Sequence, residues 1–77
     1  MNEEDIEKRV FLLAIYKKAP DESLMDVTRT LANTGMFDLK QGKKILKALR
    51  EEQYIVNEQL TVKGIAVAAE AETEFKL

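Results

Sequence analysis

The residues best suited to chemistry in this 77-residue chain are five cations within one short stretch. The stretch is Asp38–Arg50, DLKQGKKILKALR, and no acid follows Asp38 within it. At about 100° per residue the cations share an arc of about 120°, and the apolar residues take the opposite side. A helix here would bury one face and offer a positive face to an anionic ligand. The cations are Lys40, Lys43, Lys44, Lys47 and Arg50.

The charge of this stretch contrasts with that of the rest of the chain. The net charge is −2, so the residues outside the stretch from Leu39 to Arg50 carry seven more acids than bases. A plainer interpretation also stands, because lysines commonly do no more than solvate the outer face of a surface helix. The helices and strands predicted on either side of the stretch are needed to choose between these two interpretations.

Catalytic and metal-binding chemistry is not expected. The chain has no histidine and no cysteine, so the commonest general base and the thiolate and imidazole metal ligands are missing. No glycine-rich phosphate loop and no nucleophile–base pair at an interpretable spacing occurs. Ser23 and Asp26 fit a helix cap better than a catalytic pair. We therefore expect no enzyme activity, no metal site and no cofactor.

Length and composition predict one domain over residues 1–77. The chain is 45% apolar and 34% charged, which is typical of globular proteins, although a core of this size is marginal and a second copy could complete it. The longest apolar run, Val10–Tyr16, is too short to span a bilayer. No membrane partner is expected, and a cytoplasmic location is the default expectation.

Apolar spacing predicts two helices before the cationic stretch. The first covers about 3–18 and is apolar on so many sides that it is either the central helix of the domain or partly faces another subunit. The second covers about 24–32, begins at a capping-box variant formed by Ser23 and Asp26, and ends before Gly35, which supplies a left-handed conformation.

The second half of the chain predicts a helix, a hairpin and a last helix. Asp38 caps a third helix over about 38–52, and Gly42 inside it indicates tight helix packing rather than close approach of a ligand. Tyr54–Val56 and Leu60–Val62 then read as two strands, within a hairpin over about 54–63. The last helix covers about 64–75, with Glu70 and Glu74 on its outer side.

The first and last helices are expected to pack together, either within one chain or between two. Small residues after Gly64 permit close approach of another helix, so both arrangements remain open. If the contact is a homodimer interface, its candidate residues are Phe11, Ile15, Ala68, Ala69 and Phe75.

The predicted order of elements, helix-helix-turn-helix-hairpin-helix, resembles the winged helix-turn-helix family. The segment LKQGKKILKALREEQYIVNEQLTVKGIAVA is similar to the recognition helix, wing and following helix of that family. Its L-T-V-K-G-I-A portion is similar to the close of the wing in small bacterial regulators. The resemblance extends from about Ile6 to Ala71, and it implies a mostly α fold with a small β-hairpin.

The resemblance also implies a function and a set of site residues. In this family the third helix lies in the DNA major groove and the wing touches the flanking backbone or minor groove. This implies a small transcriptional regulator that binds double-stranded DNA; the alternative is a protein-interaction module that docks an acidic partner without binding DNA. The implied DNA-binding residues are Lys40, Gln41, Lys43, Lys44 and Lys47 on the helix, with Gln59 and Lys63 from the wing.

Overall fold

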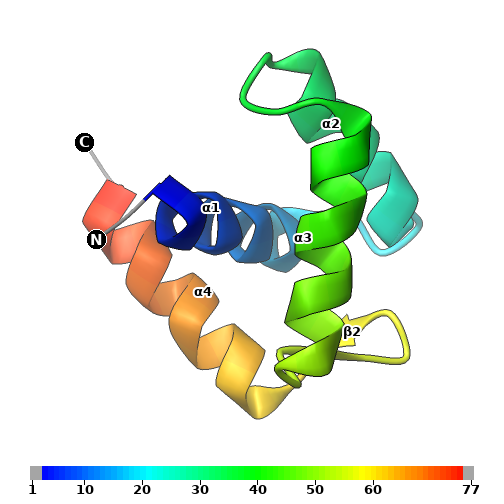
Figure 1. The fold of residues 1–77 in the computed structure, drawn as a ribbon. Coiled ribbons are helices and arrows are strands. Elements are labelled where there is room, and N and C mark those ends of the chain that lie inside the picture. Colours follow the sequence, from blue (N-terminus) through cyan, green and yellow to red (C-terminus); the bar gives the residue numbers. More distant parts are fainter. Residues whose placement is uncertain (1–2, 76–77) are drawn as a thin grey trace.

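A computed structural model describes residues 3–75 of the chain, and it confirms the predicted order α-α-α-β-β-α within them (Figure 1). Every helix boundary except the start of the last helix lies within one residue of its predicted position. The elements are α1 (Glu3–Lys17), α2 (Leu24–Asn33), α3 (Leu39–Glu51), β1 (Ile55–Val56), β2 (Gln59–Leu60) and α4 (Val62–Phe75).

Helix α1 is the central helix of the domain, and the other helices pack around it. It contacts α2, α3, α4 and strand β2, and Figure 1 shows α3 and α4 on different sides of it. Phe11, Leu12 and Ile15 of α1 are buried in the core, where the Phe11 ring stacks on Phe37 at a centroid distance of 6.1 Å. The many-sided apolar surface of α1 is therefore explained by burial within one chain.

This burial corrects the predicted dimer interface. Phe11 is 0% exposed, Ile15 4% and Ala68 0%, because α1 and α4 pack against each other within the chain. These three side chains are covered and cannot contact a second copy, so their assignment to an interface is wrong. Ala69 is exposed, and the side chain of Phe75 lies outside the described residues.

Local capping fixes where α2 begins. The Ser23 hydroxyl accepts a hydrogen bond from the Asp26 backbone N–H at 3.1 Å, and the Asp26 carboxylate accepts one from the Ser23 N–H at 3.0 Å. This reciprocal pair is the predicted capping box. Gly35 follows α2 with a φ of +84°, the left-handed conformation expected at that position.

The inner face of α3 packs closely on α2. The Asp38 carboxylate caps the helix by accepting a hydrogen bond from the Gln41 N–H at 2.7 Å. A Cβ atom on Gly42 would lie 2.7 Å from Thr28 Cγ2 and 3.0 Å from Phe37 Cε1, closer than packed carbon atoms approach. The glycine thus serves tight helix packing, as predicted.

The hairpin is shorter than predicted. Its strands pair Ile55 with Leu60 and Val56 with Gln59, and the turn is the two residues Asn57 and Glu58, both at positive φ. Gln59 therefore belongs to a strand rather than to the turn.

Helix α4 correspondingly starts at Val62, two residues earlier than predicted. Thr61 acts as its cap, because its hydroxyl accepts a hydrogen bond from the Gly64 N–H at 3.1 Å. Thr61 also donates its own N–H to the Tyr54 carbonyl, which ties the start of α4 to the hairpin. Across residues 3–75, no helix combines the length and apolarity needed to cross a bilayer.

Candidate nucleic-acid interface

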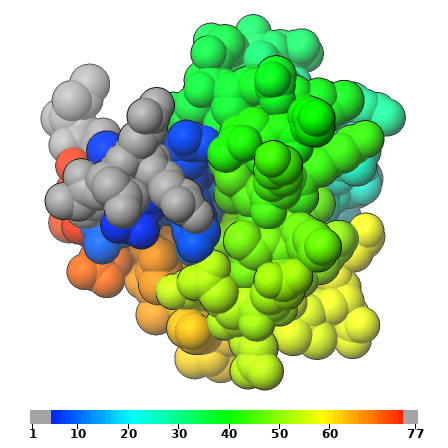
Figure 2. Space-filling model, viewed as in Figure 1, coloured from blue at the N-terminus to red at the C-terminus, as the bar shows by residue number. Residues whose placement is uncertain are grey.

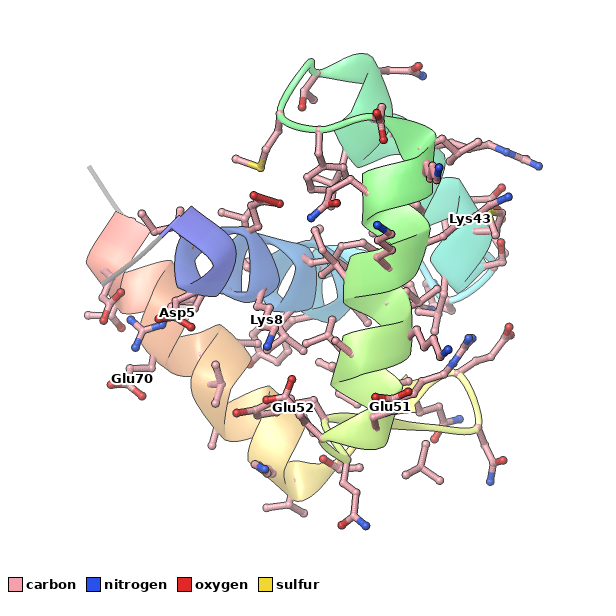
Figure 3. The ribbon with its side chains drawn as sticks, viewed as in Figure 1. Asp5, Lys8, Lys43, Glu51, Glu52 and Glu70 are labelled. Atoms are coloured by element: carbon pink, nitrogen blue, oxygen red, sulfur yellow. The ribbon has the colours of Figure 1, made fainter. Side chains whose placement is uncertain are left out.

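The outer face of α3 carries the five predicted cations, and all five side chains are exposed. Figure 2 shows α3 uncovered along its length, and Figure 3 shows Lys43 on the side of the helix away from α1. The opposite side buries Ile45, Leu46 and Leu49, which fixes the rotation of the helix about its axis. We call this set of five side chains, Lys40, Lys43, Lys44, Lys47 and Arg50, the cationic face.

The cationic face differs in its ion pairing from the cations of α1 and α2. Four cations elsewhere pair with carboxylates: Lys8 with Glu52 at 2.7 Å, Arg9 with Glu74, Lys17 with Glu72, and Arg29 with Asp26 at 3.8 Å. Among the described side chains, no carboxylate forms an ion pair with any cation of the cationic face. Its charge is therefore balanced only by solvent ions, which a polyanion can displace.

Two of these ion pairs raise the pKa of their cation. A hydrogen bond to Glu74 raises the pKa of Arg9, and a hydrogen bond to Glu72 raises that of Lys17. Both pairs join α1 to α4 on the surface. Two acids of α4 thus compensate cations of α1 rather than those of α3.

Gln41 lies at the edge of the cationic face rather than in its centre. Its side chain is half-buried and lines a hollow of about 290 Å³ between α1 and α3, together with Lys8, Lys44 and Ala48. Lys44 lines the same hollow while remaining exposed. These are the two polar α3 side chains that line the hollow beside α1.

The two residues implied for the wing lie in different elements. Gln59 is exposed on β2, as expected for a hairpin residue. Lys63 is in the first turn of α4, where its ammonium donates to the Glu52 carbonyl at 3.0 Å and lies 4.4 Å from the centre of the Tyr54 ring. The predicted placement of Lys63 in the wing is wrong, because Thr61 starts the helix before it.

Acidic residues limit the cationic face at one end. Glu51 and Glu52 lie at the lower end of α3 in Figure 3, and Glu58 is exposed in the turn of the hairpin. Glu52 is already paired with Lys8, but Glu51 and Glu58 have no ion-pair partner among the described side chains. The positive surface thus covers the first three turns of α3 more strongly than its last.

Sequence reasoning missed two apolar side chains beside the cationic face. Met36 is 44% exposed and Leu39 is 38% exposed, both at the N-terminal end of α3. Helical spacing could not reveal Met36, because it precedes the helix. Within the described residues, no group of three or more acidic side chains is placed to hold a metal ion.

Comparison with family models, with curated proteins and with solved structures gives no match for this chain. The likeness to winged helix-turn-helix domains therefore rests on the sequence motifs and on the order of elements.

Proposed function

We propose that this protein binds double-stranded DNA by placing α3 in the major groove, as a small transcriptional regulator of the winged helix type. The observation that supports the proposal most is the ion-pairing contrast: cations on α1 and α2 have carboxylate partners, whereas the cationic face has none among the described side chains.

The dimensions of α3 suit this role. Its 13 residues give a helix about 20 Å long, and the major groove of B-DNA, about 12 Å wide, admits an α-helix. Lysines on the cationic face would contact phosphates on the groove walls or guanine edges, and Gln41 would pair with an adenine edge. Phosphate contacts would dominate the affinity and make it dependent on salt.

A salt titration of binding to random duplex DNA, followed by fluorescence anisotropy, tests the proposal. We expect a dissociation constant in the range of about 10⁻⁴–10⁻⁶ M near physiological salt, tightening as salt is lowered. Lys43→Glu with Lys47→Glu should abolish this binding. The melting temperature of this double variant should differ little from that of the wild type, because both side chains are exposed.

A second double variant controls for net charge. Lys17→Glu with Arg29→Glu lowers the charge by the same amount, at two exposed positions outside α3. This control should retain most of the DNA affinity. Failure of the wild type to bind at low salt, or equal loss in both double variants, would contradict the proposal.

A second candidate function is the docking of an acidic protein on the same face. It is favoured by Met36 and Leu39, which add exposed apolar surface next to the lysines, as protein interfaces require at their centre. Leu39→Ser separates the two functions. It should leave DNA affinity nearly unchanged, whereas capture of a protein partner should fall with Leu39→Ser as well as with the double lysine variant.

A further inference from the structure

Helix α4 carries a second apolar stripe that the chain itself leaves uncovered. Val62 is 85% exposed and Ile65 43% exposed, and Ala66 and Ala69 are exposed as well. These positions follow the spacing i, i+3, i+4, i+7, which places them on one side of the helix. The inward side, which packs on α1, is formed by Gly64, Val67, Ala68 and Ala71.

The outward stripe continues onto neighbouring elements. Tyr16 at the end of α1 is 44% exposed, and it lines a hollow of about 270 Å³ together with the apolar Ile65 and Leu60 and the polar Lys18, Glu58 and Gln59. Three of the large exposed apolar side chains, Val62, Ile65 and Tyr16, are thus on or beside one helix. Exposed apolar side chains gathered on one side of a helix in this way are typical of an interaction site. We call Tyr16, Val62, Ile65, Ala66 and Ala69 the α4 outer patch.

We propose that the α4 outer patch binds a second copy of this chain, with the two α4 helices antiparallel about a twofold axis near Ala66. Charge placement selects this occupant and this direction. Lys63 and Glu70 are seven residues apart, so they lie on the same flank of the stripe, about 20° apart around the helix. Figure 3 shows Glu70 on the flank of α4 near Asp5 of α1, and Glu70 forms no ion pair among the described side chains.

Antiparallel pairing places each Lys63 opposite the partner's Glu70. The midpoint between positions 63 and 70 falls beside Ala66, which is also close to the centre of the apolar stripe. A single twofold axis at this point therefore brings the two apolar stripes together and also pairs Lys63 with the partner's Glu70. Parallel pairing would instead place the Lys63–Glu70 flanks of the two copies on opposite sides of the contact, so these charges would not meet. The Lys63 ammonium has three N–H donors and uses one on the Glu52 carbonyl, so others remain for the partner.

The size of the patch predicts a weak dimer. A stable interface buries about 800 Å² on each partner, and a contact centred on one helix of 14 residues falls short of that. Alanines at the centre let the two helix axes approach to about 8 Å, and this close packing partly compensates for the small buried area. The cationic face stays accessible, because α3 and α4 lie on different sides of α1 (Figure 1). This inference does not depend on DNA binding.

Sedimentation velocity over micromolar to millimolar concentrations tests the dimer. The wild type should shift from monomer to dimer as concentration rises, whereas Ala66→Glu should stay monomeric because two carboxylates would meet near the axis. Asn33→Glu, at an exposed position on α2, is the control and should dimerise as the wild type does. A wild type that is monomeric throughout, or a control that behaves like Ala66→Glu, would overturn the proposal.

A charge exchange tests the antiparallel direction. Lys63→Glu and Glu70→Lys should each weaken dimerisation several-fold, and the two together should restore it. Thermal unfolding of each variant separates this effect from loss of the Lys63 hydrogen bond to Glu52. A double variant that dimerises no better than the single ones would overturn the proposed pairing.

Introduced cysteines give an independent check, since the chain has none of its own. Under mild oxidation Ala66→Cys should form a disulfide-linked dimer, because the two copies of this position meet near the axis. Thr73→Cys should not, because antiparallel helices separate those two positions by about 20 Å along the axis. Equal linkage at both positions would indicate parallel helices and would refute the arrangement.

Discussion

Helices α3 and α4 differ in what they present to solvent, although both pack on α1 and have similar lengths of 13 and 14 residues. Helix α3 has one apolar side, which is buried, and a cationic side. Helix α4 has apolar residues on both sides, and only one of these sides is buried. The comparison shows that the inner face of a helix fixes its place in the fold, whereas the outer face determines what it can bind.

The acids of the two helices account for much of this difference. Helix α4 contains Glu72 and Glu74, which pair with Lys17 and Arg9 of α1 and hold the two helices together at the surface. Helix α3 has no acid before Glu51, so its cations stay uncompensated. Helices α1 and α4 together carry more acids than bases and are partly apolar at the surface, whereas the α3 surface is positive.

A larger side chain should reduce the stability of the fold on the inner side of α4 but not on its outer side, and this is the largest effect we expect. Ala68→Leu would force three extra carbon atoms into the closely packed α1–α4 contact and should lower stability by about 1–3 kcal/mol. Ala69→Leu, one residue away on the exposed side, is the matched control and should be nearly neutral. Urea unfolding at low protein concentration measures both, and equal losses would mean that the assigned inner side of α4 is wrong.

The inner face of α3 should tolerate almost no added volume. Gly42→Ala should destabilise the fold toward the lower end of about 1–3 kcal/mol, because its Cβ would meet Thr28 Cγ2, and each 1 kcal/mol lowers the melting temperature by about 4–8 °C. Adding Thr28→Ser should recover part of the loss, since serine lacks that methyl group but keeps the hydroxyl that donates to Leu24. Calorimetry of the four proteins in this cycle measures the recovery, and its absence would exclude this collision as the cause.

The hairpin turn offers a smaller test of how α3 meets DNA. If the hairpin lies along the backbone, Glu58→Lys should replace a repulsion with a phosphate contact, tightening binding several-fold and steepening the salt slope by about 0.9. Asp21→Lys changes the charge equally at a distant exposed turn and should leave the slope unchanged. Equal effects of the two substitutions in the anisotropy titration would show that the hairpin does not contact the DNA.

The capping box of α2 should give the smallest effect, limited to acidic pH. A hydrogen bond from the Ser23 backbone N–H, followed by one with the Ser23 hydroxyl, lowers the pKa of Asp26. Stability from this carboxylate is fully present above its unfolded pKa, about 3.9, and is lost as pH falls through the lower folded pKa. Asp26→Asn should therefore be less stable than the wild type near neutral pH, with the difference shrinking below about pH 4. Chemical unfolding between acidic and neutral pH checks this; a constant difference would contradict it.

The sequence by itself determined the rotation of α3 and the positions of the local caps. Charged side chains are expensive to bury, so only one side of α3 could face the core, and all five cations are exposed as predicted. Ser23, Gly35 and Asp38 act through neighbours a few residues away, which makes their roles readable from the chain. The hairpin turn and the half-buried position of Gln41 needed the structure.

Only the tertiary structure decided which side of α4 is buried. Two stripes with the same helical spacing compete there, one starting at Val62 and one at Gly64, and the transfer of apolar surface from water would by itself favour burial of the larger side chains in the Val62 stripe. The fold buries the stripe with the smaller residues, because Gly64 and Ala68 let the helix approach the hairpin and α1 closely, and Thr61 fixes where the helix begins. That choice depends on contacts between distant segments of the chain, and it leaves Val62 and Ile65 in solvent.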